Sequence, residues 1–275
     1  MDIYIPFIIV GVAGAFLLTA VNYIGVQFAS WVQQVLSAAI VAVGLLMIAA
    51  ALSSGDPANA QPMFANGVEG VLSVAVITPF FMVGFDVIPQ AAEEADIPAK
   101  KMGRLMLLSI VMAAAWYCVI LLCVSLLIDQ KTIATAELCT ADALMLAWNG
   151  NILARYIVVF GGICGIITSW NAFLNAGSRV LYSMGKSGML PAWFAKLHPK
   201  YKTPSNAILF IGGISAIAPF FGEQVLSWIS NTASLSTVIA YSLVAVSFLV
   251  LRKKEPDMHR PYKIRNGNLV GGIAV

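Results

Sequence analysis

The chain has 275 residues, of which 60% are hydrophobic and 11% are charged, with a formal net charge of +3. Soluble globular domains carry about 25% charged residues, so this composition excludes an ordinary soluble domain and indicates an integral membrane protein. The mean hydropathy of +0.86 supports the same class, and the four cysteines show no spacing that indicates a metal site or a disulfide framework.

Uncharged stretches that approach the roughly 20 apolar residues needed to cross a bilayer occur along the whole chain. We predict seven helical spans, at residues 3–22, 30–52, from about 70, 105–128, 156–178, 206–222 and 224–251. Residues 268–275 resemble the start of a further span. The predicted fold class is therefore an all-α polytopic membrane protein. An amphipathic helix at residues 141–148 is expected to cap an outer vestibule or to lie at the membrane interface.

Basic residues predict the orientation of these spans, because cytoplasmic loops are enriched in lysine and arginine. If the spans alternate, all of the 16 basic residues except Lys131 and Arg155 fall on one side. We expect that side to be cytoplasmic and the protein to lie in the cell membrane. Met1 would then lie outside, so we expect an upstream part, and the end of the last span, to be missing from the chain.

The third span contains an interruption, GFDVIP, at residues 84–89. Gly84 weakens a helix, and Pro89 removes one donor and clashes with the carbonyl group of Phe85. In a bilayer, non-helical backbone is tolerated only where it is buried in protein or lines a cavity, and broken helices are typical of transporter binding sites. We therefore predict that the substrate-binding residues are Phe81, Val83, Gly84, Phe85 and Asp86.

Asp86 and its aromatic neighbours each have two interpretations. The carboxylate is either the N-cap of the second half-helix, accepting from the backbone of Ile88 or Gln90, or a site for a substrate ammonium group or a proton. A charge at the membrane centre costs about 2.5–3.5 kcal/mol on insertion scales, which favours a functional role beside any structural one. Phe81 and Phe85 either close over the substrate or pack in the core or against lipid.

Polar residues at the end of the third span and in the fifth span are further candidates. Glu93 and Glu94 are either solvated at a helix end or form a gate with a basic residue such as Arg179. Asn171 and Asn175 are four residues apart and share a helix face, so we expect them to form hydrogen bonds between helices, with contact to the substrate as the alternative.

Four blocks of the sequence resemble one permease family. They are VNYIGVQFASWVQQVL at 21–36, GFDVIPQAAEE at 84–94, TSWNAFLNAGSRVLYSMGKSGMLPAWFAKLHPKYKTPSNA at 168–207 and LRKKEPDMHRPYKI at 251–264. In order and spacing they resemble the amino acid–polyamine–organocation (APC) superfamily, over nearly the whole chain. They look like the family's turn between spans four and five, its broken span six, its span eight and its basic loop after span ten.

The resemblance implies two inverted five-helix repeats, whose first and sixth spans are broken at the substrate site. This chain would then hold the last two helices of the first repeat (1–52), an outer loop (53–69), the second repeat with its break at 83–89 (70–267) and the start of a further helix (268–275). The family's first broken span, which holds the substrate carboxylate, would be absent.

The resemblance leaves the coupling ion open. Many proton-coupled members carry a lysine in the fifth family span, where this chain has Ile40 and no lysine. Thr168 and Ser169 look like the hydroxyl ligands of a cation in sodium-coupled relatives of the fold. Alternatively, they bond to the helix carbonyl group four residues earlier. We expect no cofactor, and Na+ or H+ is the candidate coupling ion.

These features predict secondary active transport of an amino acid or related amine by alternating access, without enzymatic activity. The expected partners are the substrate, the lipid bilayer and missing N-terminal spans in cis or in trans, with no nucleic acid. One alternative is a non-transporting fragment or a subunit of a split permease. Another is a membrane-embedded carboxylate enzyme using Asp86, Glu93 and Glu94, which is disfavoured because no predicted span contains a histidine and no metal-ligand spacing appears.

Overall fold

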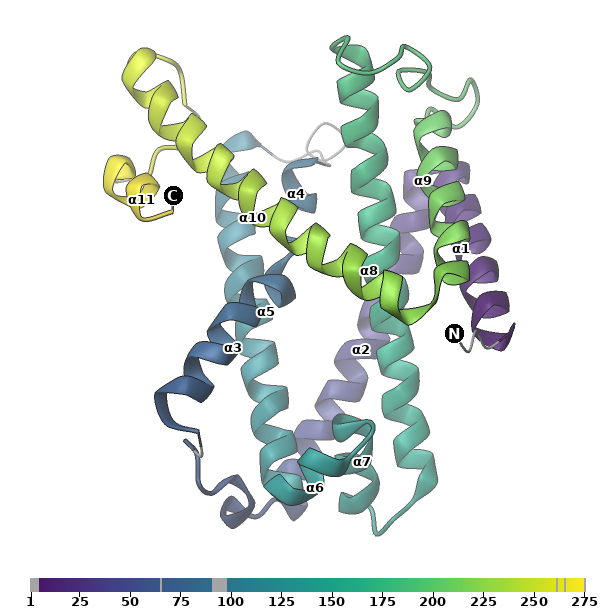
Figure 1. Cartoon of the computed structure of the whole chain (residues 1–275), viewed down its shortest axis with the longest axis vertical. Helices are drawn as coiled ribbons and strands as arrows, with labels where there is room; N and C mark the ends of the chain where they lie inside the picture. Colours follow the sequence, from purple (N-terminus) through teal and green to yellow (C-terminus); the bar gives the residue numbers. More distant parts are fainter. Residues whose placement is uncertain (1–4, 65, 91–97, 261, 265, 275) are drawn as a thin grey trace.

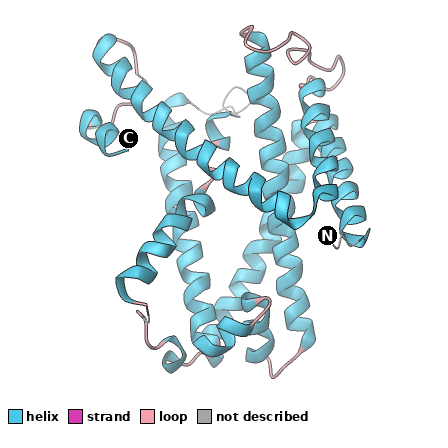
Figure 2. Cartoon of the chain, in the orientation of Figure 1, coloured by secondary structure: helices cyan, strands magenta, loops and turns pink. Residues whose placement is uncertain are grey.

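The computed structural model of the chain describes residues 5–64, 66–90, 98–260, 262–264 and 266–274, and in these ranges it consists of helices and loops without a strand (Figures 1 and 2). The predicted all-α class is therefore confirmed. The elements in chain order are α1 (Ile5–Ile24), α2 (Val26–Ser54), η1 (Pro57–Ala60), α3 (Gly67–Met82), α4 (Val87–Gln90), α5 (Ala99–Leu127), α6 (Gln130–Thr135), α7 (Cys139–Ala147), α8 (Ile152–Lys186), α9 (Ser205–Ile217), η2 (Ala218–Phe221), α10 (Gly222–Lys254) and α11 (Gly267–Ala274).

Within the described ranges, five helical segments are long and apolar enough to cross a membrane. They lie in α1, α2, α5, α8 and α10 and cover Ile5–Ile24, Gln27–Ser54, Lys101–Leu127, Ile152–Lys186 and Thr232–Lys254. The other two predicted spans correspond to shorter apolar helices. Helix α3 has 16 residues and ends at the interruption, and α9 with η2 forms one apolar stretch. The chain is therefore a multi-pass membrane protein.

Helix α8 is longer than the predicted span 156–178. The side chain of Asn151 caps its first turn by accepting from the backbone N–H of Leu153 at 3.0 Å, and Gly188, with φ 78°, follows its end. The prediction followed the apolar run, which stops at Arg179. The helix continues to Lys186 because its backbone hydrogen bonds do not require apolar side chains.

The larger buried cluster joins α2, α5, α7 and α8. The amphipathic helix predicted at 141–148 is α7, and its apolar face, including the fully buried Ala143 and Leu144, packs on α5 and α8. Outside this contact, Nε of Arg155 lies 3.1 Å from Oδ1 of Asp142 and ties the start of α8 to α7. Helix α7 is therefore anchored to the helix bundle by both packing and charge.

Two glycines allow close helix crossings. A Cβ atom on Gly44 of α2 would lie 2.1 Å from the Trp116 ring of α5, and a Cβ atom on Gly212 of α9 would lie 2.2 Å from Oγ1 of Thr19 in α1. Small residues at helix crossings are the usual means of close packing in membranes, where lipid removes much of the hydrophobic driving force. These two crossings position α5 against α2, and α9 against α1.

The chain turns between α9 and α10 without a loop. The 3-10 helix η2 follows α9 directly, and Gly222, with φ +74°, is both the residue after η2 and the first residue of α10. Glycine adopts this left-handed conformation without steric cost. The path of α10 therefore diverges from α9 within one residue (Figure 1).

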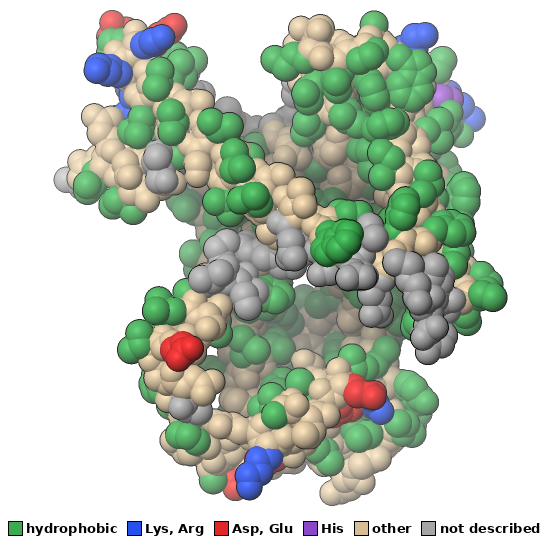
Figure 3. All heavy atoms as spheres, viewed as in Figure 1, with side chains coloured by type: hydrophobic (Ala, Val, Ile, Leu, Met, Phe, Trp, Pro, Cys, Tyr) green, Lys and Arg blue, Asp and Glu red, His purple; other side chains and the backbone are tan. Residues whose placement is uncertain are grey.

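The connection 187–204 and the C-terminal end of α10 lie at one end of the molecule, whereas α6 and α7 lie at the other (Figure 1). We call the first of these the basic end, because lysine and arginine side chains gather at the tips of these segments (Figure 3). We predicted that successive spans cross the membrane in opposite directions, which places the basic connections on one side. The arrangement of the spans that follow α5 agrees with this prediction. The asymmetry of charge along the molecular axis is the pattern expected of a protein inserted with one fixed orientation.

The crossing of α2 and α5 is directly testable. We expect Gly44→Ala to lower the unfolding free energy by about 1–3 kcal/mol, the usual cost of overpacking, because the indole ring of Trp116 blocks the added methyl group. Gly162→Ala is the matched control, since Gly162 is also helical and no atom lies within 4 Å of its added Cβ atom. The measurement is reversible unfolding of the purified chain in mixed micelles, and equal midpoints for the two variants would contradict the crossing.

Candidate functional site

The candidate site is the interruption between α3 and α4. Helix α3 ends at Met82, residues 83–86 form a turn, and α4 begins at Val87, within the predicted range 83–89. The amide of Val87 donates to the carbonyl group of Gly84 at 3.2 Å, so the local pairing is that of a turn. Gly84 has φ +127°, a conformation that other residues rarely adopt. Glycine is therefore required here by the backbone.

The Asp86 carboxylate is half-buried and holds both sides of the turn together. Its Oδ1 accepts from the backbone N–H of Gly84 at 3.1 Å, and its Oδ2 accepts from Nε2 of Gln90 at 3.2 Å. The predicted N-cap bonds from the backbone of Ile88 or Gln90 are not formed; the Ile88 amide donates to the carbonyl group of Phe85 at 3.3 Å. Asp86 therefore braces the turn from inside, and it keeps unused acceptor capacity on both oxygens.

Tyr241 of α10 completes one wall of the site and was not predicted from the sequence. Its ring centroid lies 5.4 Å from that of Phe85, with the planes tilted by 40°. Its hydroxyl group is buried and interacts with the nearby Asp86 carboxylate, although no hydrogen bond of ordinary geometry joins the two groups. A buried donor without a well-formed hydrogen bond costs free energy, and the Asp86 carboxylate is the charged group that acts on this hydroxyl.

The two phenylalanines of the predicted site face different neighbours. Phe81 is 56% exposed, and its ring lies 6.3 Å from the ring of Tyr117 in α5. Phe85 is half-buried against Tyr241 instead. Val83, between them, is half-buried. In this structure the turn therefore brings Val83, Gly84, Phe85 and Asp86 together, while Phe81 lies toward α5.

The two hydroxyl residues of α8 differ in their surroundings. Thr168 is buried, and its hydroxyl group donates to the carbonyl group of Gly165 at 2.8 Å, three residues earlier instead of the four we expected. Ser169 is exposed. Neither hydroxyl bonds to a described residue of the turn. Within the described ranges no three His, Cys, Asp or Glu side chains come together in a way that could hold a metal ion.

The predicted gate is described on one side only. Glu93 and Glu94 lie outside the described residues. Arg179 of α8 is half-buried, and its Nη1 donates to the backbone carbonyl oxygen of Asn175 at 2.7 Å and also to the side-chain oxygen of the same residue. Helix α4, which precedes the two glutamates, packs against α8 and α5.

A buried polar cluster joins α1, α2 and α8. Nδ2 of Asn22 donates to Oδ1 of Asn171 at 2.7 Å, and Nδ2 of Asn171 donates to Oε1 of Gln33 at 3.0 Å and to the carbonyl group of Ala29 at 3.3 Å. The prediction of interhelical bonds is therefore confirmed for Asn171. Asn175, in contrast, bonds to Arg179 within its own helix.

Comparison with known proteins gives a consistent result. The family model described as "Amino acid permease" matches residues 3–275. The chain is 31% identical over 262 residues to the branched-chain amino acid permease BcaP of Bacillus subtilis (strain 168), covering 94% of this chain and 55% of the relative. It is 30% identical over 251 residues to the methylthioribose transporter of the same organism, covering 90% and 53%. It is 28% identical over 249 residues to the vacuolar cationic amino acid transporter 8 of Arabidopsis thaliana, covering 90% and 41%. The chain therefore spans about half the length of these relatives or less.

The backbone requirement at Gly84 can be tested without any transport assay. We expect Gly84→Ala to destabilise the chain by about 1–3 kcal/mol, the cost of a residue held in a sparsely populated backbone conformation. An added Cβ atom would meet no atom within 4 Å, so the cost arises from the backbone alone. Gly165→Ala, also free of contacts but inside α8, should be neutral or stabilising by up to about 1 kcal/mol. Unfolding midpoints in mixed micelles give the comparison, and a Gly84→Ala midpoint at or above that of the control would exclude the left-handed turn.

Proposed function

This chain belongs to the amino acid permease family, and we propose that it acts in secondary active transport of an amino acid or a related amine across a membrane by alternating access. The family and the relatives are permeases and transporters, not enzymes. The names of the relatives refer to branched-chain amino acids, to methylthioribose and to cationic amino acids. Because these molecules differ, we propose a class of substrate and no single compound.

The observation that carries the proposal is the Asp86 carboxylate inside a helix interruption. Unwound backbone at membrane depth is typical of substrate sites in transporters, and an ionisable residue there costs free energy unless it serves a function. Asp86 already accepts from Gly84 and Gln90 and can accept further bonds from an ammonium group. A charge-assisted bond of this kind is about twice as strong as a neutral one.

Tyr241 and Phe85 supply the second part of the proposed site. Their rings lie side by side, and an aromatic pair next to a carboxylate offers an apolar surface for a substrate side chain. The unpartnered Tyr241 hydroxyl group would donate to the substrate or to Asp86 when the site closes. The helix is already interrupted at the turn that contains Gly84. Movement about this turn would therefore change the distance between the Tyr241 hydroxyl group and the Asp86 carboxylate.

The remaining roles belong to the same proposal. A gradient of Na+ or H+ would drive transport, with Thr168 and Ser169 as candidate ligands; the Thr168 oxygen still has lone pairs after donating to Gly165. Glu93, Glu94 and Arg179 would form the inner gate.

The relatives are longer than this chain, so we propose that further helices act with it, in cis or in trans, in the cytoplasmic membrane. A non-transporting subunit role is the alternative that the uptake assay below distinguishes.

Asp86→Asn tests the site. We expect it to lower uptake by roughly tenfold to a hundredfold, the effect of losing a hydrogen bond to a charged group of about 1.5–3 kcal/mol. Uptake of labelled leucine, arginine and methylthioribose is measured in proteoliposomes holding the chain, with and without co-expressed full-length relatives, under Na+ and pH gradients. Asp56→Asn is the matched control, because Asp56 caps η1 at the surface and carries the same charge. Unchanged uptake and pH dependence in Asp86→Asn would reject the site, and no uptake by any form of the chain would favour the subunit role.

Tyr241→Phe separates function from stability. Removing a buried hydroxyl group that lacks a partner should leave the unfolding free energy unchanged or raise it by about 1 kcal/mol, while the ring contact with Phe85 is kept. We expect uptake to fall by roughly threefold or more, since a lost neutral hydrogen bond contributes about 0.5–1.5 kcal/mol. Unfolding midpoints and initial uptake rates are compared on the same preparation. A destabilised variant would show that the hydroxyl group forms an ordinary structural hydrogen bond. A variant with full uptake would show that the hydroxyl group forms no bond that transport requires.

A further inference from the structure

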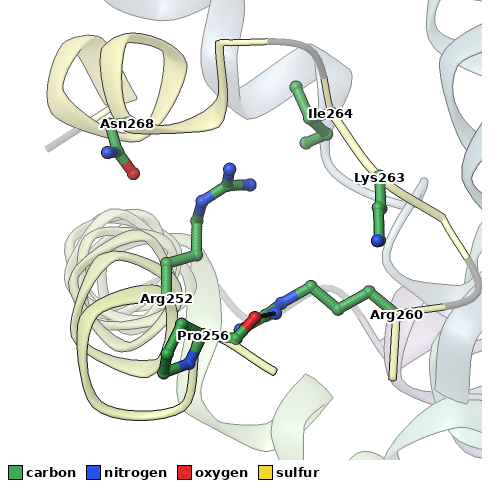
Figure 4. Close-up of a pocket in the computed structure, with 6 residues that line it drawn as sticks. All are labelled: Arg252, Pro256, Arg260, Lys263, Ile264 and Asn268. Carbon is green, nitrogen blue, oxygen red and sulfur yellow. Dashed lines mark hydrogen bonds between the residues drawn. The ribbon is translucent and has the colours of Figure 1, made fainter. Parts of the chain in front are cut away.

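A pocket lies at the basic end, where α10 leaves the predicted membrane region. It has a volume of about 330 Å3 and is lined by Arg252, Pro256, Arg260, Lys263, Ile264 and Asn268. Figure 4 shows these residues surrounding it from the end of α10, the connecting segment and the start of α11. Three of the six side chains are cationic and none is acidic, so the pocket is electrostatically suited to an anion.

Arg260 has a structural role in this pocket. Its Nη1 donates to the carbonyl groups of Pro256 and Met258 at 3.0 and 3.1 Å, and its Nη2 donates to those of Leu251 and Glu255 at 3.3 and 2.6 Å. These bonds cap the C-terminal end of α10, where helix carbonyl groups lack partners. The charge of Arg260 remains in the pocket, but its Nη donors are already used.

Arg252 and Lys263 are differently placed. The Arg252 guanidinium lies 5.4 Å from the ring centroid of Phe248, and a Cβ atom on Gly267 would lie 2.2 Å from its Nη1. The start of α11 therefore closes against Arg252 and helps to orient it. Neither Arg252 nor Lys263 forms a hydrogen bond or an ion pair within the described ranges, so two cations face one pocket without a counter-ion.

The position of the pocket decides which anion fits. Arg252 is the first basic residue in the last turn of the span that ends at Lys254, which is the depth at which lipid headgroups lie. Ile264 and Pro256 add apolar surface beside the cations. Arginine and lysine both bind phosphate oxygens, arginine through two parallel N–H groups. A phosphate group attached to acyl chains satisfies both the charge and the depth.

We propose that this pocket binds the phosphate group of an anionic phospholipid, held by Arg252 and Lys263 and framed by the Arg260 cap. The assignment does not depend on the transport proposal. It concerns binding at the basic end of the molecule, and it is tested by a binding measurement in which uptake plays no part.

The test is native mass spectrometry of the full chain in detergent, titrated with phosphatidylglycerol and, separately, with phosphatidylcholine of the same acyl chains. The variant Arg252→Gln with Lys263→Gln should bind phosphatidylglycerol about thirtyfold more weakly than wild type, as expected for two basic residues at an anionic headgroup. The matched control, Lys253→Gln with Lys254→Gln, loses the same amount of charge from the turn of α10 that carries Arg252, and neither lysine lines the pocket. It should bind within about twofold of wild type.

Each outcome decides the proposal. Equal losses in the two double variants would mean attraction to general surface charge and would overturn it. Displacement of phosphatidylglycerol by millimolar inorganic phosphate would assign the pocket to a soluble phosphate and overturn the lipid source. Equal binding of both lipids by wild type would remove the requirement for an anion. The charge-keeping variant Arg252→Lys with Lys263→Arg should retain binding, which shows that both positions tolerate another side chain and that the loss in the glutamine variant follows the removed charge.

Discussion

Every backbone amide in an apolar environment needs a partner within the protein, and this constraint shapes the whole molecule. Helices meet it by themselves, which is why the described chain is helical and why its spans can pack without a large hydrophobic drive between them. The turn at residues 83–86 is the exception inside a predicted span. There the Asp86 carboxylate accepts from the Gly84 amide and replaces part of the missing helical pairing. One side chain therefore both satisfies the break and supplies the charge of the proposed site.

The same constraint explains how the scaffold around the turn is held. Asn171 links α8 to Asn22 in α1 and to Gln33 in α2, so three helices share one buried polar cluster. Interhelical bonds in membranes average a fraction of a kcal/mol to about 2 kcal/mol each, less than a rigid scaffold needs. Close crossings such as that of Gly44 on Trp116 add van der Waals contact. Together, polar bonds and small residues hold a fixed frame around a helix that is interrupted.

The features that could be predicted from the sequence are those set by local chemistry. Gly84 and Pro89 predicted the interruption because their backbone properties do not depend on tertiary contacts. The predicted limits of the helices were less accurate, as in α8. An apolar run marks the part of a helix that lies inside the bilayer, whereas the backbone hydrogen bonds of the helix continue beyond it. The position of the Tyr241 ring beside Phe85 depends on the path of α10, which no local pattern in the sequence encodes. The only available signal for Tyr241 was a phenol group within a stretch of α10 that carries no charged residue.

The turn at Gly222 has a consequence for biosynthesis. Helix α9 and η2 together cover 17 residues, roughly 28 Å at the rises of the two helix types, which is slightly less than the thickness of a bilayer core. No loop separates them from α10, and Glu223 is the one charged residue at the junction, so the emerging chain exposes no long hydrophilic segment between the two. The pair would leave the translocon as one helical hairpin, and the three successive basic residues at the end of α10 would act as the stop that fixes it in place.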